Sequence, residues 1–433
     1  MKVELRNICK IKKADIDIDG LTIITGENDT GKSTIGKLLF SLINSNQLHD
    51  GELEELKEDI YSNIEEIYFL LRKKRKFVSN ADFRREFMPP HFMRQIDKYL
   101  EYDDIESIKE IILLKKRILS GAFDNESLVE IYEKLDNILE SIDLNNDDKT
   151  LLEKKLKKYL DSEFNFELTN KIGKDLAEVN IFDGENKLVE LNIEKDKINK
   201  YEIRDILNFK DATYIETPLI LQMYDFIRMS QRASIGRSIK YKRSNLLPLH
   251  MLDLVDKMEL SRFYDDNKID YEIGNIISGH VNFNRKNNNF SFSKVYEGVK
   301  VNFKPLNTAS GIKSFGILEL LINADAINKN SLLIIDEPEI HLHPEWQIEY
   351  ARLICYLASS GIKVLITTHS PYMLQAFDYF SNELKENDFF RVYLTEKQEQ
   401  NDLTEFRNVT YEINEAFYKL SVPLQKIMWG NVE

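Results

Sequence analysis

Apolar and polar positions alternate along the first part of the chain in the way that is typical of β-strands. The alternation runs over residues 3–18, and a mostly apolar run, Leu21–Ile24, follows it. Period two predicts strands with one buried face, and the apolar run predicts a strand buried on both faces. Over residues 35–43 the apolar spacing changes to three and four, which predicts a helix. We therefore expect strands, a loop and a helix at the N-terminus.

Residues 46–162 carry the pattern of amphipathic helices. Apolar side chains recur at spacings of three and four, for example between Leu128 and Ile142, and the positions between them are rich in Glu and Lys. The pattern does not keep a heptad repeat for three or four heptads in succession, so it does not favour a long coiled coil. We expect this segment to be a compact helical insertion.

The rest of the chain switches between strand-like and helix-like patterns. Residues 163–215 return to period two, with Asp183-Gly184 between two alternating runs as the signal of a hairpin. After residue 306, the apolar runs Leu332–Ile335 and Val364–Ile366 alternate with helical stretches, as in parallel strands that are covered on both faces. We predict an α/β fold in five parts. These are the first part of an α/β domain (1–45), a helical insertion (46–162), a β-strand part (163–215), a helical lobe (216–305) and the last part of the α/β domain (306–433).

Composition narrows the class of protein. Of the 433 residues, 42% are hydrophobic, which is enough for a substantial core, and 30% are charged. The sequence contains no run near the roughly 18 apolar residues that a membrane-spanning helix needs. Glu4 lies where a signal peptide has only basic residues. We expect a cytoplasmic protein without membrane contact.

Charge is distributed unevenly along the chain. The formal net charge of −14 argues against a protein that binds nucleic acid over its whole surface. Two basic clusters are exceptions, namely Arg72–Lys76 with Arg84 and Arg85, and the run from Arg237 to Arg243. Either is a candidate for a local contact with a nucleic acid backbone. A solvated helix face or a contact with a partner protein is the commoner role of such runs.

The most specific motif is a phosphate-binding loop between the predicted buried strand and the first helix. It matches the pattern G-x-x-x-x-G-K-[ST], whose backbone N–H groups surround phosphate oxygens. The following helix directs its positive N-terminal end at the anion. Lys32 is expected to bind the β- and γ-phosphates of ATP, and Ser33 to ligate Mg²⁺. The predicted ATP-binding residues are Gly26, Glu27, Asn28, Asp29, Thr30, Gly31, Lys32, Ser33 and Thr34.

Two adjacent carboxylates, Asp336 and Glu337, follow directly after the apolar run Leu332–Ile335. Ligands of α/β sheets bind at the carboxyl ends of the strands. Asp336 is expected to hold Mg²⁺ directly or through water. Glu337 is expected to orient and deprotonate the water that attacks the nucleotide. An ordinary acidic turn after a strand is the alternative.

Two weaker signals lie nearby. His369 follows the apolar run Val364–Ile366, where a neutral imidazole can donate a hydrogen bond to the γ-phosphate. A lone histidine more often has a structural role. Ser310 stands at the start of a predicted helix, which it can cap and whose N–H groups can bind a phosphate. By itself this segment favours a plain helix cap.

The order of these motifs resembles a known family, the ATP-binding-cassette-type ATPases of the SMC, DNA-repair and OLD branch. The segments that carry the resemblance are Arg6-Asn7-Ile8, GENDTGKST at 26–34, ASGIKSF at 309–315, DEPEIHLHP at 336–344 and ITTHSP at 366–371. Residues 46–300 match only as an insertion at the expected place. The resemblance implies a P-loop nucleotide-binding head of the ABC/SMC type with a large α-helical insertion and a small β-subdomain.

The resemblance also implies a mechanism. In this family two heads enclose two ATP molecules, and the signature segment of one head closes over the γ-phosphate held by the other. Ser310, Gly311 and Lys313 would act in this way on a second copy, although Lys313 stands where the family usually has Gln or a similar polar residue. Gln222 is the candidate for the glutamine that senses Mg²⁺. The implied cofactors are ATP and Mg²⁺, and the implied assembly is a homodimer or a higher homo-oligomer.

A partner effector follows from the same resemblance. The chain resembles the ATPase subunits of bacterial anti-phage systems, namely the PtuA subunits of Septu, which work with an HNH nuclease, and those of PARIS, which hold a toxin. Residues 390–396 imitate the first strand and glutamate of the OLD nuclease domain, but Asp402 is the one aspartate after Glu396, which is too few for a two-metal site. We expect an ATPase that regulates a separate nuclease or toxin in defence. A nucleotide-dependent scaffold with little turnover and a DNA-repair ATPase stay open as alternatives.

Overall fold

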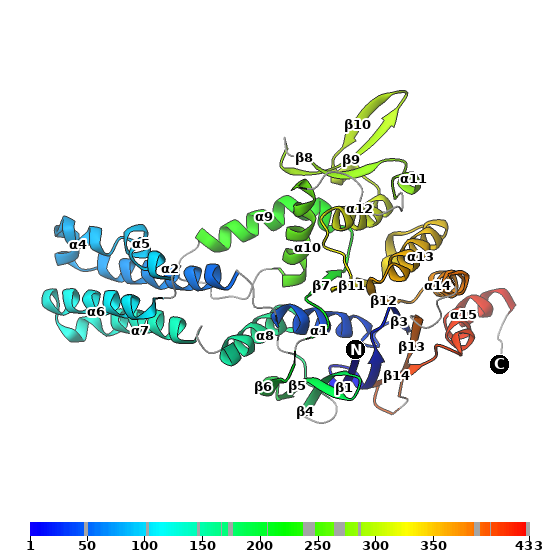
Figure 1. Cartoon of the computed structure of the whole chain (residues 1–433), viewed down its shortest axis with the longest axis horizontal. Helices are drawn as coiled ribbons and strands as arrows, with labels where there is room; N and C mark the ends of the chain where they lie inside the picture. Colours follow the sequence, from blue (N-terminus) through cyan, green and yellow to red (C-terminus); the bar gives the residue numbers. More distant parts are fainter. Residues whose placement is uncertain are drawn as a thin grey trace. The chain divides into compact units, whose positions relative to one another are not determined.

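The computed structural model contains two compact units. Unit 1 consists of Met1–Gln47, Leu156–Arg228 and Asn245–Glu433, and unit 2 of Leu48–Lys155 and Met229–Ser244 (Figure 1). The structure describes residues 1–46, 51–100, 104–144, 148–165, 167–171, 176–205, 207–236, 247–263, 273–284, 287–384, 390–398 and 400–429. The basic run from Arg237 to Arg243 lies outside the described residues.

Unit 1 is built on one large sheet, which has eleven strands in the described residues. Their order is β6-β5-β4-β1-β2-β14-β13-β3-β12-β11-β7. From β13 to β7 all neighbours are parallel. The strands are β1 Lys2–Ile8, β2 Ile11–Asp17, β3 Leu21–Gly26, β4 Leu176–Asp183, β5 Asn186–Glu194, β6 Lys197–Ile203, β7 Asp211–Ile215, β11 Ser331–Asp336, β12 Lys363–Thr368, β13 Phe390–Lys397 and β14 Thr404–Asn408.

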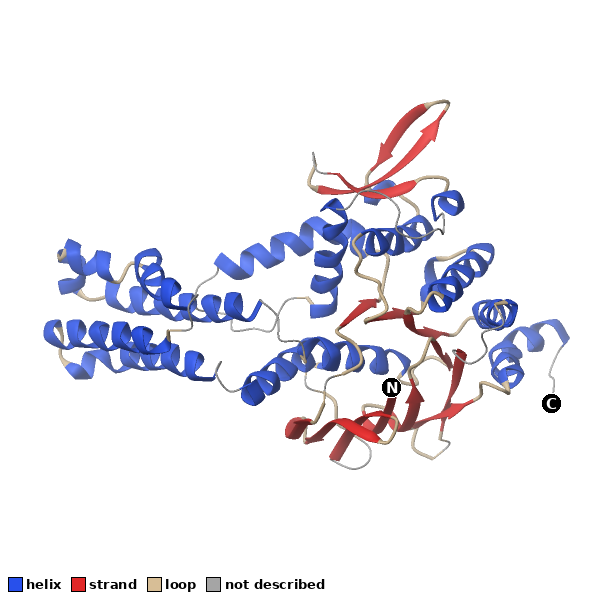
Figure 2. Ribbon diagram, in the orientation of Figure 1, coloured by secondary structure: helices blue, strands red, loops and turns tan. Residues whose placement is uncertain are grey.

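Helices cover both faces of the parallel strands. The side chains of Ile23 and Ile335 belong to one core with α13 (Pro344–Ser359) and α14 (Pro371–Glu383). Ile334 points to the other face, where it lies next to Gly36 of α1 (Lys32–Ser45). Figure 2 shows these helices on either side of the strands. Burial on both faces explains the continuous apolar runs of β3 and β11. The predicted α/β fold is confirmed.

Two strand segments extend the main sheet. The strands of residues 163–215, which we expected as a β-strand part of the same domain, join it because β4 pairs with β1. The segment that we compared with a nuclease strand forms β13, which pairs in parallel with β3 and puts Thr395 opposite Gly26. β13 therefore belongs to the main sheet, in the part of the chain (306–433) that we expected to complete the α/β domain.

The lobe of unit 1 carries helices and a second sheet, which is antiparallel with the order β10-β9-β8. Helix α12 packs closely on this sheet, because a Cβ on Gly316 would lie 2.3 Å from the Val281 side chain. The elements are α9 Ile220–Gly236, α10 Leu249–Leu260, α11 Ile273–Ile277, β8 His280–Asn284, β9 Asn289–Tyr296, β10 Val299–Phe303 and α12 Ser310–Asn323. Helix α15 (Ile413–Trp429) follows β14.

Unit 2 is helical and has its own core. Phe77, Phe83, Phe87 and Phe92 form a chain of ring contacts in it. The buried ammonium of Lys115 lies 4.7 Å from the Phe92 ring centroid. The helices are α2 Gly51–Arg72, α3 Arg75–Ser79, α4 Ala81–Glu86, α5 Pro89–Leu100, α6 Ile105–Ala122 and α7 Val129–Leu144.

The boundaries of the two units differ from the expected division. We expected the insertion to reach residue 162, but α8 (Asp148–Phe164) belongs to unit 1 from Leu156 onward. The reason is packing, since Leu156 and Leu160 are buried and the Tyr159 ring contacts Phe40 of α1. The end of α9 from Met229, which we expected in the lobe, is grouped with unit 2.

Candidate nucleotide-binding site

The phosphate-binding loop lies between β3 and α1. Gly26 and Gly31 have φ angles of 144° and 81°, which L side chains rarely adopt. Gly26 also faces β13 so closely that a Cβ would lie 1.9 Å from Thr395 Oγ1. Thr395 Oγ1 donates to Thr30 Oγ1 at 2.9 Å, and Thr30 Oγ1 donates to the carbonyl of Glu27 at 2.9 Å. A strand from the far end of the sequence therefore supports the loop, and the sequence carried no signal for Thr395.

The Lys32 side chain lies inside this loop. Its ammonium donates to the carbonyl oxygens of Gly26 at 3.2 Å and Glu27 at 2.7 Å, and lies 3.8 Å from Glu337 Oε1. Burial lowers the pKa of Lys32, and the nearby Glu337 and Asp336 oppose this shift. The Lys32 ammonium is already paired with carbonyl oxygens and lies near a carboxylate. It could exchange these partners for a phosphate oxygen without being left buried and unpaired.

The other loop residues differ in exposure. Glu27, Asn28 and Asp29 are exposed, whereas Ser33 and Thr34 are half-buried in the first turn of α1. Asp29 forms an ion pair with Lys10, from the turn between β1 and β2. The loop is thus tied to its neighbours on two sides.

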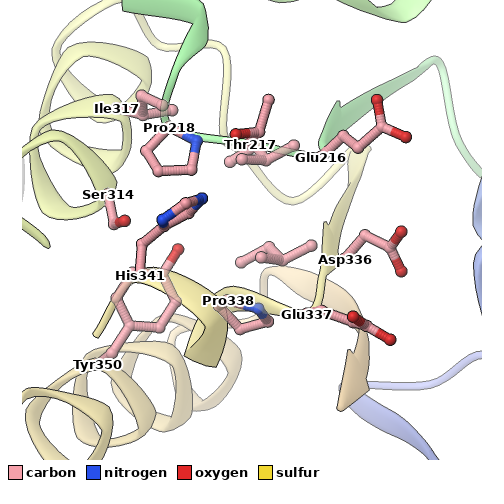
Figure 3. Close-up of a pocket in the computed structure, with 12 residues that line it drawn as sticks. Glu216, Thr217, Pro218, Ser314, Ile317, Asp336, Glu337, Pro338, His341 and Tyr350 are labelled. Carbon is pink, nitrogen blue, oxygen red and sulfur yellow. The ribbon is translucent and has the colours of Figure 1, made fainter. Parts of the chain in front are cut away.

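β11, two strands away from β3, ends at Asp336, and Glu337 follows it directly. Asp336 accepts hydrogen bonds from the Tyr214 hydroxyl at 2.9 Å and from the Thr367 hydroxyl. Glu337 has a left-handed backbone with φ 44°, and its N–H donates to the Thr367 carbonyl at 3.1 Å. Strained conformations of non-glycine residues gather at functional sites. In Figure 3 the carboxylates of Glu216, Asp336 and Glu337 project to the same side.

His369 follows β12, the strand between β3 and β11. Its Nδ1 lies 3.6 Å from Glu337 Oε1 and 3.2 Å from Glu339 Oε1. Interaction with Glu337 raises the pKa of His369, and the same pair lowers the pKa of Glu337. The three strand ends therefore bring the phosphate loop, the two carboxylates and this histidine together.

Glu339 is a residue of the site that we did not single out. It is buried, and its Oε1 accepts from the Thr368 hydroxyl at 2.8 Å and from the backbone N–H groups of His369 at 2.6 Å and Ser370 at 3.1 Å. The same carboxylate thus holds the turn that carries His369. The sequence Asp336–Glu339 could have indicated a role for Glu339. It is the third acidic residue after an apolar strand, and a buried carboxylate needs hydrogen-bond partners.

A small cavity of about 20 Å³ lies behind the carboxylates. Ser314, His341 and Tyr350 line it from the side opposite to Asp336 and Glu337 (Figure 3). Such a volume is enough for about one water molecule. This cavity is therefore too small for a nucleotide.

The signature segment is built differently from our expectation. We expected Ser310 to cap α12, but the cap residue is Ala309, which has no side chain that can bind the helix N–H groups. Ser310 is the first residue of the helix, and the first N–H groups of α12 have no acceptor from a cap side chain. Gly311 packs against Trp346, where a Cβ would lie 2.7 Å from the indole ring.

Lys313 and Gln222 contact each other. The ammonium of Lys313 donates to Gln222 Oε1 at 2.8 Å, and burial lowers the pKa of Lys313. We had expected Lys313 to reach the nucleotide of a second copy and Gln222 to bind Mg²⁺. In this structure each side chain serves as the partner of the other.

The donor set at the strand ends fits Mg²⁺. The Ser33 hydroxyl and the Asp336 carboxylate are hard oxygen ligands, and Mg²⁺ usually combines one or two such ligands with substrate phosphates and water. Tyr214 and Thr367 hold Asp336 in place by hydrogen bonds. Within the described part of the chain, no group of three or more His, Cys, Asp or Glu residues forms a metal cage of its own.

His343 caps α13 by accepting from the Glu345 N–H at 3.4 Å.

Comparison with known proteins places the chain in a family. Residues 1–374 match the family model described as an AAA ATPase domain. The chain belongs to the AAA ATPase domain family. The prediction of an ATPase family is confirmed by this match, and short stretches similar to PtuA and to Old nuclease, given below, agree with the predicted resemblance.

Curated relatives share local stretches with this chain. Septu protein PtuA of Bacillus thuringiensis is 44% identical over 45 residues, which are 10% of this chain and 11% of that protein. Protein ea59 of Escherichia phage lambda is 29% identical over 119 residues, 26% of this chain and 22% of that protein. Old nuclease of Escherichia phage P2 is 41% identical over 54 residues, 12% of this chain and 9% of that protein. The chain thus spans less than a quarter of each of these relatives.

Solved SMC heads are similar in structure. The SMC head domain from Thermotoga maritima aligns with a TM-score of 0.38 and 11% identity, covering 94% of this chain and 98% of that chain. An SMC head bound to the C-winged helix domain of ScpA aligns with a TM-score of 0.42 and 13% identity, covering 96% of this chain and 98% of that chain.

Among the described helices, none combines the length and the apolar character that crossing a bilayer requires.

Proposed function

We propose that this chain binds ATP with Mg²⁺ and hydrolyses the terminal phosphate. The observation that carries the proposal is the convergence of Lys32, Glu337 and His369 at three neighbouring strand ends, with Lys32 Nζ 3.8 Å from Glu337 Oε1. Lys32 and the loop N–H groups bind the β- and γ-phosphates. Glu337 accepts a proton from the attacking water, and His369 orients Glu337. Mg²⁺, held by Ser33 and Asp336, neutralises phosphate charge when bound.

Phosphate release by wild type and by Glu337→Gln tests this proposal. Removing the general base should lower kcat by about 10²–10⁴-fold, while ATP binding persists because the loop is unchanged. Hydrolysis should require Mg²⁺, so chelation should abolish it. Equal, negligible turnover by both proteins would favour the second candidate, a scaffold that binds ATP and rarely hydrolyses it. The contact between Lys313 and Gln222 supports that candidate, because it occupies the side chains expected to reach a second copy's nucleotide and to sense Mg²⁺.

The proposed site is completed by a second copy of the chain. The first N–H groups of α12, which receive no acceptor from a cap side chain, are suited to a phosphate held by another head. Glu337→Gln should therefore form a dimer of heads with ATP, and Ser310→Arg in the same background should remain monomeric. Light scattering after size-exclusion chromatography measures both masses. A measured mass above that of a dimer would mean that the heads also assemble through contacts outside the ATP site.

We place this ATPase in the cytoplasm as the regulator of a nuclease or toxin in anti-phage defence. Support comes from the local similarity to the Septu protein PtuA and to Old nuclease. Purification of the chain together with the products of neighbouring genes tests this role. A stable complex with a nuclease or toxin is expected. A solitary protein whose neighbours have no effect on phage infection contradicts it.

A DNA-repair ATPase remains a candidate because of one feature of unit 2. Residues 72–94 carry eight basic and two acidic residues in a chain of net charge −14. Arg72, Lys73, Lys76 and Arg85 in this segment are exposed. If the segment binds a nucleic acid backbone, DNA should stimulate hydrolysis, and the stimulation should weaken steeply as salt rises. Unchanged hydrolysis with DNA at low salt excludes this candidate.

A further inference from the structure

His250 is buried between two carboxylates. Its ring Nδ1 lies 2.6 Å from Glu163 Oε2, and its Nε2 lies 3.2 Å from Glu216 Oε2. The His250 side chain is 1% exposed and that of Glu163 is not exposed at all. An ionised carboxylate only accepts hydrogen bonds, so an imidazole between two carboxylates fits best when both ring nitrogens donate and the ring carries a positive charge.

The same group joins four elements around the nucleotide site. Glu163 ends α8, Glu216 follows β7, and His250 begins α10. Lys37, on α1 one turn after Lys32, donates to Glu216 Oε1 at 2.9 Å. The pKa of Glu216 falls to about 2, first because of its hydrogen bond with His250 and then because of Lys37. The carboxylate next to the nucleotide site is thus held from both sides.

The end of α8 also caps α10. The Leu249 N–H donates to Ser162 Oγ at 2.9 Å, and the His250 N–H donates to Glu163 Oε1 at 3.1 Å. These contacts satisfy N–H groups that the helix itself leaves open. Glu163 therefore binds both the backbone and the ring of His250.

His250 contacts the site by packing as well. Its ring centroid lies 4.9 Å from that of Tyr214, in an edge-on arrangement. The Tyr214 hydroxyl donates to Asp336 Oδ2. A shift of the imidazole would move both Glu216 and the tyrosine that holds Asp336. The His250 ring also lies edge-on to Phe40, at 6.2 Å.

We propose that protonated His250 is a positioning residue of the ATPase site, which clamps the end of α8 to the segment after β7 and so keeps Glu216, Tyr214 and Asp336 aligned for hydrolysis. The inference rests on the proposed ATPase function. The titratable groups in contact with His250 are Glu163 from α8, Glu216 after β7 and Tyr214 from β7. Asp253 and Lys257 lie further along α10 and form an ion pair with each other.

The pH dependence follows from the direction of the shift. Hydrogen bonds to Glu163 and Glu216 overcome the effect of burial and raise the pKa of His250. The protonated clamp is complete below the ordinary histidine pKa and is lost as the pH rises through the raised value. In wild type, kcat should therefore decline as the pH rises through the raised pKa of His250, while KM changes little because the phosphate loop is intact.

Glu163→Gln tests the clamp, with Glu319→Gln as the matched control. Glu319, like Glu163, is a glutamate with little exposure that pairs with a histidine: its Oε1 lies 2.6 Å from Nδ1 of the exposed His280, and its Oε2 accepts from the Val281 N–H. Removing the Glu163 charge should move the decline of kcat about one pH unit lower. His250→Gln should lower kcat on the order of tenfold and remove the decline of kcat that accompanies rising pH. Glu319→Gln should match wild type. Superimposable profiles of wild type and Glu163→Gln would overturn the proposal.

A second measurement does not depend on hydrolysis. The ring proton resonances of the seven histidines can be titrated by NMR, with His250 assigned from His250→Gln. If the charged imidazole favours the ATP-competent site, ATP with Mg²⁺ must raise the pKa of His250 by reciprocity, and His280 should not respond. If wild type binds ATP but does not hydrolyse it, the proposed ATPase function is contradicted and the clamp is not. If the pKa of His250 does not change on addition of ATP, the clamp is contradicted.

Discussion

At the scale of single residues, the phosphate loop depends on a hydroxyl from β13. Thr395→Val keeps the shape of the side chain but removes the hydrogen bond to Thr30. Loss of one buried hydrogen bond costs about 1 kcal/mol, so the Kd for ATP should rise about fivefold. Fluorescent nucleotide titration measures the change.

Thr404→Val is the matched control for this substitution. Thr404 lies on the neighbouring strand β14, and its buried Oγ1 has no hydrogen-bond partner within the described structure. Its removal should leave ATP affinity unchanged. Equal affinities of the Thr395 and Thr404 variants would show that the hydroxyl of Thr395 does not support the loop.

Glu339 should affect turnover without affecting ATP binding. Glu339→Gln replaces one acceptor oxygen by a donor, in a place where three protein groups donate to Oε1. The turn that carries His369 then loses charge-assisted hydrogen bonds, so kcat should fall on the order of tenfold with little change in the Kd for ATP. Phosphate release and nucleotide titration separate the two quantities. Glu345→Gln, an exposed position at the start of α13, should behave like wild type.

At the scale of elements, the approach of α1 to the sheet limits what position 36 can hold. A Cβ at Gly36 would lie 2.7 Å from Tyr214 Cε2 and 2.9 Å from Ile334 Cγ2. Gly36→Ala should therefore push α1 away from β7 and β11 and destabilise unit 1 by about 1–3 kcal/mol, although alanine favours helices. Thermal unfolding measures the effect.

Gly121 provides the opposite case. It lies in α6, where a Cβ would have no neighbour within 4 Å among the described atoms. Gly121→Ala should stabilise unit 2 by about 0.5–1 kcal/mol, because alanine loses less backbone entropy in a helix. A destabilised Gly121→Ala or an unaffected Gly36→Ala would contradict the packing described above.

At the scale of the whole molecule, two compact units should respond differently to nucleotide. The proposed ATP site lies within unit 1, so ATP with Mg²⁺ at about 100 times its Kd should stabilise that unit by about 2.7 kcal/mol. Differential scanning calorimetry should show the transition of unit 1 moving to higher temperature while that of unit 2 stays. Lys32→Ala should abolish the shift. A single transition that moves as a whole would mean that the two units unfold together.

The sequence alone predicted the α/β fold and the relationship to a family of ATPases, and both are confirmed. It also located the candidate loop at 26–34 and the acidic pair at Asp336 and Glu337. These features can be predicted from the sequence because each depends on residues that are close together in the chain. A glycine needs a particular backbone conformation, a helix begins at a particular residue, and a strand buried on both faces must be apolar along its length.

Only the tertiary structure decided how distant segments complete the site. It put β13 beside β3, so that Thr395 reaches Thr30 across 365 positions. It paired Lys313 with Gln222 and enclosed His250 between Glu163 and Glu216. Hydrophobic periodicity shows which face of an element is buried but not which element covers it. Pairing between distant elements depends on the packing of the whole domain, so these contacts could not be derived from local pattern.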